Sequence, residues 1–74
     1  MKIPIIDMVT TGKNIKRIRE SKGISVRELQ EAFGFTNPQA IYKWQNGTSI
    51  PTLDNLVILA SVLDTTVDEI IVTE

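Results

Sequence analysis

Residues 25–47 read SVRELQEAFGFTNPQAIYKWQNG, and this stretch predicts two short helices joined by a tight turn. The first helix has a clear start, because Ser25 and Glu28 are spaced as a capping box. In such a box the serine hydroxyl accepts from the third helical N–H, and the glutamate reaches back to the serine N–H. Gly34 is expected to stop this helix. Its apolar side is supplied by Leu29, Ala32 and Phe33.

The second helix is expected over Pro38–Asn46. Asn37 is a good N-cap, and proline suits the first helical position because its missing N–H would be unpaired there anyway. Ile41 and Trp44 are three residues apart and so share one side of the helix. This spacing predicts that Trp44 is a core anchor, although a tryptophan can also stack on a base. The polar side chains on the other side are Gln39, Tyr42, Lys43 and Asn46.

A further helix is expected before this stretch. Thr10 or Thr11 can act as its N-cap, and Ile15 and Ile18 lie on one side of it. Gly23 is expected to end it as a left-handed C-terminal cap.

Two more helices are expected after residue 50. Thr52 can cap the first of them. Thr66 and Glu69 are spaced as a second capping box, which opens a short helix with Ile70 and Ile71. The apolar stripe of the longer helix consists of Leu53, Leu56, Leu59, Ala60 and Leu63.

The predicted fold class is therefore all-α, a compact bundle of five short helices. Residues 1–74 are expected to form a single domain, with a helix-turn-helix over residues 25–46. Residues 1–10 are expected to be an N-terminal arm, in which Ile3 to Ile6 can lie extended and pack across the domain.

Composition argues against most enzyme classes. The chain has neither cysteine nor histidine, so thiolate metal sites and the commonest general base are missing. We expect no catalysis, no metal and no cofactor. The adjacent carboxylates of Asp68 and Glu69 lie in a first helical turn, where acids favour the helix dipole. No apolar run approaches the ~20 residues that cross a bilayer, and the start lacks a secretory signal, so a cytoplasmic protein is expected.

The charge is unevenly distributed. The formal net charge is −1, which by itself disfavours binding to phosphates. However, residues 1–43 carry all eight basic side chains and four of the acids, whereas residues 44–74 carry five acids and no basic side chain. A chain polarised in this way can present one basic face. The alternative is that the basic side chains only solvate the exposed side of one helix.

The outer side of the helix over residues 38–46 carries groups that can read DNA. Gln39 and Lys43 are four residues apart and are neighbours in space. Glutamine can bond adenine N6 and N7, and lysine can donate to guanine O6 and N7. Tyr42 can donate to a phosphate or pack on a thymine methyl, and Asn37 lies where side chains first meet base edges. An ordinary solvated face would have the same composition.

Residues 24–34 (ISVRELQEAFG) and 41–47 (IYKWQNG) resemble the lambda-repressor-like helix-turn-helix family, the Cro and phage-repressor type. The similarity continues through residues 51–56 (PTLDNL) and 66–70 (TVDEI), so it covers about residues 13–71. The combined pattern is specific, whereas each piece alone is weak.

The resemblance implies sequence-specific binding of double-stranded DNA by a transcriptional regulator of the repressor type, with the helix over residues 38–46 in the major groove. Because one helix reads only a few base pairs, it also implies a homodimer on an inverted-repeat operator. The candidates for base contacts are Asn37, Gln39, Ala40 and Lys43, with Tyr42 as a weaker one. The candidates for contacts to the DNA backbone are Ser25, Arg27, Asn46, Thr48 and Ser49.

The chain departs from the family pattern at three points. Gly34 and Ile41 are seven residues apart, whereas the family usually has six, so the turn carries one extra residue. Gln30 stands where the family favours alanine, at the place where the two helices cross. Val26 stands where a glutamine usually contacts phosphate.

A symmetric dimer needs a self-complementary patch. Ile58 and Val62 lie off the main stripe of their helix, and Ile70-Ile71-Val72 lie near the end of the chain, so these residues are candidates for it. Alternatively they belong to the core, since a small domain needs every aliphatic side chain it has.

The alternative function is a protein-interaction module that has the same fold and does not bind DNA, such as an antirepressor or an antitoxin-like partner. The acidic balance and Val26 favour it.

Overall fold

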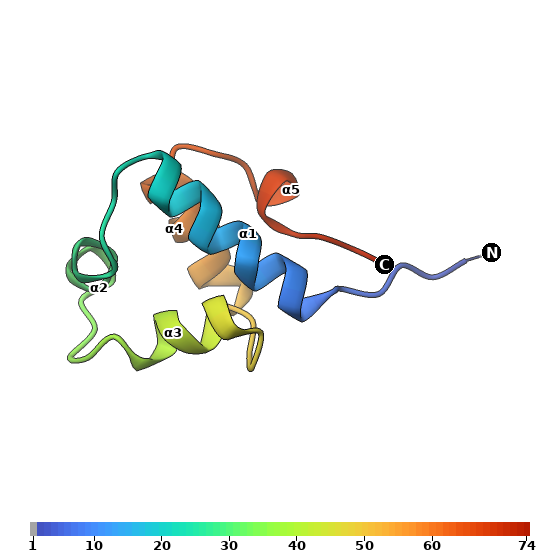
Figure 1. The fold of residues 1–74 in the computed structure, drawn as a ribbon, viewed down its shortest axis with the longest axis horizontal. Coiled ribbons are helices and arrows are strands. Elements are labelled where there is room, and N and C mark those ends of the chain that lie inside the picture. Colours follow the sequence, from blue (N-terminus) through green and yellow to red (C-terminus); the bar gives the residue numbers. More distant parts are fainter. Residues whose placement is uncertain (1) are drawn as a thin grey trace.

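The computed structural model describes residues 2–74, which form five helices around one core (Figure 1). The helices are α1 (Met8–Ser21), α2 (Val26–Phe33), α3 (Gln39–Asn46), α4 (Leu53–Val62) and α5 (Val67–Ile70). Strand-like pairing among the described residues is limited to an antiparallel bridge between Ile6 and Thr73. The predicted all-α bundle of five short helices is confirmed. None of these helices is long and apolar enough to cross a membrane.

The first helix begins earlier than predicted. Asp7, and not Thr10 or Thr11, is the N-cap of α1, and its carboxylate accepts from the backbone N–H of Thr10 (3.0 Å) and from its hydroxyl (2.8 Å). These two hydrogen bonds stabilise the charged carboxylate and lower the pKa of Asp7. Thr11 is buried. The predicted arm over residues 1–10 was therefore too long, because the helix already begins at Met8.

Residues 5–7 lie extended beside the C-terminal segment, residues 2–4 continue past it, and both ends of the chain lie at the same end of the molecule (Figure 1). Two backbone hydrogen bonds of 2.8 Å join them to residues 72–74. The hydroxyl of Thr11 both donates to and accepts from the backbone of this segment, which ties it to α1. The arm does not pack across the domain as predicted, since the side chains of Ile3 and Ile5 are 78% and 60% exposed.

Local hydrogen bonds bear out most of the predicted helix starts. Ser25 and Glu28 form both halves of the capping box of α2, and the hydroxyl of Thr52 caps α4. The second capping box is only half formed. The Thr66 hydroxyl accepts from the Glu69 N–H, but the Glu69 carboxylate accepts from a neighbouring threonine hydroxyl and not from the N-cap backbone.

Every helix contributes to the core. Its buried apolar side chains are Ile15, Ile18, Leu29, Ile41, Trp44, Leu56, Leu59, Ala60, Leu63 and Ile70. Two side chains assigned to apolar stripes are exposed, namely Leu53 and Ala32. Helical periodicity identifies which side of a helix is apolar, but the extent of the neighbouring helices decides how far along that side the burial reaches.

Helices α1 and α3 cross in close contact at Gly12. A methyl group at this position would overlap the carbonyl oxygen of Trp44 and would lie 2.7 Å from the carbonyl oxygen of Gln45. Both oxygens belong to the backbone of α3, so they cannot move aside as the end of a flexible side chain would. Glycine is therefore required here for close approach, and this contact places α3 relative to the rest of the bundle.

Candidate nucleic-acid interface

Helices α2 and α3 are joined by a turn at the end of the molecule opposite the chain termini (Figure 1). Gly34 ends α2 with φ of 71°, the left-handed conformation in which glycine carries no Cβ penalty. Helix α3 begins at Gln39, one residue later than predicted. Pro38 occupies the N-cap position and provides no side-chain hydrogen bond. Instead, the side-chain oxygen of Asn37 accepts from the Gln39 N–H at 3.0 Å, so Asn37 still caps the start of this helix.

An aromatic cluster holds α3 against α2 and the turn. The rings of Phe33 and Phe35 stack with centroids 5.0 Å apart. Trp44 meets both of them edge to face, at 5.4 Å and 6.0 Å. Trp44 is only 4% exposed, and Ile41 is fully buried beside it in the core. The structure therefore confirms Trp44 as a core anchor and leaves it no face on which a base could stack.

The opposite side of α3 is open to solvent. Gln39, Lys43 and Asn46 are exposed, and Tyr42 is 47% exposed. Asn37, just before the helix, is exposed as well. Ala40 differs from these candidates, because it is half-buried and packs against the core.

A groove of about 360 Å³ runs between α2 and the start of α3. It is lined by Val26, Arg27, Gln30, Pro38 and Tyr42. Arg27 and Tyr42 therefore line the same groove from opposite sides. One is a candidate for contact with the DNA backbone and the other is a candidate for base contact. Arg27 also pairs with Glu31 at 3.4 Å, with both side chains well exposed, at 85% and 68%. A pair this exposed contributes little free energy, so Arg27 can exchange it for another anion.

The candidates for backbone contact fall into two groups, and Arg19 is hydrogen-bonded to a residue next to each group. Ser25 and Arg27 lie at the start of α2, whereas the other group lies at the end of α3 and in the loop after it. Arg19, on α1, donates through Nε to the Gln45 side-chain oxygen and through Nη1 to the Ile24 carbonyl, both at 2.9 Å. One guanidinium thus spans the residues that precede Ser25 and Asn46.

Arg19 was not among the candidate residues predicted from the sequence. Its only signal is that it lies seven residues after Gly12 and so shares the side of α1 that faces α3. Both of its acceptors are neutral, so its half-buried positive charge is not cancelled by them.

The loop after α3 wraps around the end of that helix. Gly47 ends α3 with φ of 75°, and the N–H groups of Thr48 and Ser49 both point to the Lys43 carbonyl, at 3.0 Å and 3.4 Å. The side chain of Thr48 is exposed and that of Ser49 is half-buried.

The predicted dimer patch changes in the structure. Ile70 is fully buried in the core, so it cannot belong to the dimer patch. Val62 and Ile71 are half-buried, and so is Val72. Ile58 is exposed as the patch requires. Two exposed apolar side chains of the same helix, Leu53 and Val57, were not predicted to belong to it.

Among residues 2–74, no group of three or more acidic, histidine or cysteine side chains is placed to hold a metal ion. The exposed polar side of α3 lies on a helix that the apolar core holds in place, and basic and hydroxyl side chains flank it. This arrangement defines a helix-turn-helix protein.

The comparison with known families agrees. The sequence model of the helix-turn-helix family matches residues 15–70, and the chain belongs to this family. It is a DNA-binding transcription regulator of the lambda-repressor-like type. Among solved structures, it is similar to the restriction-modification controller protein C.AhdI from Aeromonas hydrophila, with 26% identity and a TM-score of 0.77 over 86% of this chain and 96% of that one. No protein with a curated description matches the chain.

Proposed function

We propose that the chain binds specific sequences of double-stranded DNA by placing α3 in the major groove. The observation that carries this proposal is the division of α3 into two sides. Ile41 and Trp44 fix it to the core, while Gln39 and Lys43 stand exposed one helical turn apart. These two side chains suit adenine and guanine edges respectively. Tyr42 is a flanking contact, and the half-buried Ala40 can offer only a methyl group to a thymine.

Backbone contacts would come from both ends of this surface. The start of α2 carries the positive end of a helix dipole and the exposed Arg27, which suits a phosphate. The other group consists of Asn46, Thr48 and Ser49 at the end of α3. Arg19 holds the two groups at a set separation and adds an uncancelled positive charge, so they can act on the same DNA backbone.

Such binding is sufficient for a repressor, because occupying promoter DNA needs no second activity. C.AhdI is described as a controller protein, and its similarity to this chain supports a regulatory and non-enzymatic role.

We further propose a homodimer on an inverted repeat, built through α4. Leu53, Val57 and Ile58 are 75%, 57% and 43% exposed on this helix. Leu53 and Val57 are four residues apart and share one side of α4, with Ile58 beside them. A symmetric pairing of this surface would cover apolar area that is costly to leave in water.

Ile58→Glu tests the dimer. A carboxylate buried without a partner costs about 3–5 kcal/mol, so the dimer dissociation constant should rise by more than about a hundredfold. Analytical ultracentrifugation measures it, and circular dichroism should show an unchanged fold because Ile58 is partly exposed in the single chain. Ala32→Glu adds the same charge on exposed α2 and serves as the control. An Ile58→Glu variant that dimerises as tightly as the parent contradicts the α4 interface.

The recognition helix is tested by the double variant Gln39→Ala, Lys43→Ala. A sequence selected by the parent protein from a random duplex pool provides the operator. With about 1–3 kcal/mol for each good base contact, the double variant should bind this operator at least about thirtyfold more weakly. It should also lose the sequence preference in a repeated selection.

Lys13→Ala is the matched control, since it removes one positive charge from the exposed side of α1. Its effect should be small and uniform across sequences. Affinity and preference that survive in the double variant would refute the assignment of α3. If the parent protein shows no salt-sensitive binding to any duplex, the interaction-module alternative replaces this proposal.

A further inference from the structure

Phe35 is the last residue of the α2–α3 turn that hydrogen bonds tie to α2. Its N–H donates to the Gln30 carbonyl at 3.0 Å, as part of the helix end at Gly34. Its carbonyl accepts from the Gln30 side-chain amide at 3.3 Å. Gln30 therefore holds both backbone polar groups of Phe35, the N–H through its own carbonyl and the carbonyl through its side-chain amide. The next two residues, Thr36 and Asn37, are exposed.

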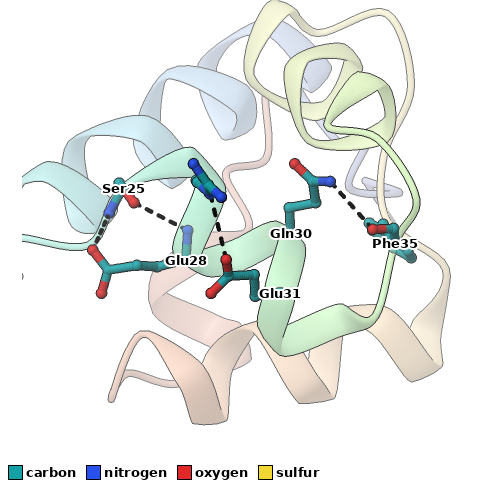
Figure 2. A network of polar contacts seen from close by, with 6 residues as sticks. Ser25, Glu28, Gln30, Glu31 and Phe35 are labelled. Carbon is teal, nitrogen blue, oxygen red and sulfur yellow. Dashed lines mark hydrogen bonds and ion pairs between the residues drawn. The ribbon is translucent and has the colours of Figure 1, made fainter.

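The position of the Gln30 side chain explains this contact. Figure 2 shows its amide directed away from the axis of α2 and toward the turn, with the nitrogen facing the Phe35 carbonyl. Gln30 is half-buried, and it lines the groove that Pro38 and Tyr42 line from the side of α3. Its side chain thus lies in the wall of this groove, at the point where the chain passes from α2 to α3.

The contact connects two unusual features of the sequence. The turn is one residue longer than the family pattern, and the residue at the helix crossing is a glutamine where that pattern has alanine. A longer turn has more conformational freedom, so ordering it costs more conformational entropy. An alanine has no group that could reach the Phe35 carbonyl, whereas glutamine supplies a donor at the required distance.

We propose that Gln30 is a positioning residue for DNA recognition. By holding the Phe35 carbonyl, its side-chain amide sets where α3 starts and therefore which base each side chain of α3 faces. This inference rests on the proposed function of α3 as the reading helix. Without the amide, the start of α3 takes up several positions, and only a fraction of the molecules presents Gln39 and Lys43 in the competent arrangement. Apparent affinity for the operator then falls by that fraction.

Gln30→Met tests the proposal, because methionine keeps the length and the packing and lacks the donor. Ala32→Met, on the exposed side of the same helix, is the control. Two quantities are compared with the parent protein: the ratio of affinities for the selected operator and for mixed duplex DNA, and amide hydrogen exchange at Tyr42. The N–H of Tyr42 donates to the Pro38 carbonyl in the first turn of α3.

In Gln30→Met, operator affinity should fall by about tenfold, while binding to mixed DNA changes by less than about twofold, because phosphate contacts do not depend on the register. Exchange at Tyr42 should become faster. An unchanged affinity ratio, or an equal loss on both DNAs, overturns the positioning role. If the parent protein binds no DNA while exchange still rises in the variant, the anchoring of the turn stands and the proposed function is what fails.

Discussion

Replacing Gly12 by alanine should destabilise the domain by about 3 kcal/mol or more, since the added methyl group meets the backbone of α3 and overpacking of this kind costs about 1–3 kcal/mol even where side chains can adjust. The direction is informative because Gly12 lies inside α1, where alanine favours the helix by about 1 kcal/mol. The overlap with the Trp44 carbonyl must outweigh that gain. For a domain of this size, the loss corresponds to a melting temperature lower by at least about 12 °C.

Gly23→Ala is the matched control for this experiment. Gly23 has φ of 71°, but no other atom approaches the position that a methyl group would take. The cost there is backbone strain alone, about 1–2 kcal/mol. Thermal unfolding followed by circular dichroism compares the two variants. A Gly12→Ala protein as stable as Gly23→Ala would mean that α1 and α3 do not approach as closely as described.

Replacing Trp44 by alanine should be comparably severe, with a loss of about 3–5 kcal/mol. Trp44 is buried, and it is the ring that joins Phe33 and Phe35 to α3. A 74-residue domain is stable by only about 4–11 kcal/mol, so the variant should be largely unfolded or close to it under mild heating. Urea unfolding monitored by circular dichroism is suitable, because the variant has lost the chain's only tryptophan fluorophore.

Trp44→Phe separates packing from recognition. It retains an aromatic ring in the cluster and should recover most of the stability and of the DNA affinity. A base-stacking residue would behave differently, because Trp44→Ala would then keep its stability and lose only affinity. That second pattern would contradict the assignment of Trp44 to the core.

Most helix ends could be predicted because they depend on neighbours a few residues away. The capping box at Ser25 and the caps at Thr52 and Asn37 involve donors within three residues, so local sequence carries the information. The predicted start of α1 was wrong because it depends on more than near neighbours. Asp7 and Thr10 are both good caps, and the choice between them involves pairing of Asp7 with the C-terminal segment, far away in sequence.

The proposed reading surface was predictable in part. Periodicity separated Ile41 and Trp44 from Gln39 and Lys43, and the structure places the first pair in the core and exposes the second. Periodicity could not show that Ala40 is half-buried, since this depends on what packs beside it.

The sequence by itself determined that residues 25–47 form two helices around a turn, with α3 turned so that its polar side faces outward. Local hydrogen bonds and the 3.6-residue repeat are sufficient for that much. Only the tertiary structure decided where α3 sits. Its position depends on the close crossing of α1 and α3 at Gly12. It also depends on the hydrogen bonds from Arg19 to Gln45 and from the Gln30 amide to the turn. The physical reason is that each of these contacts joins elements whose relative placement is set by packing of the whole core.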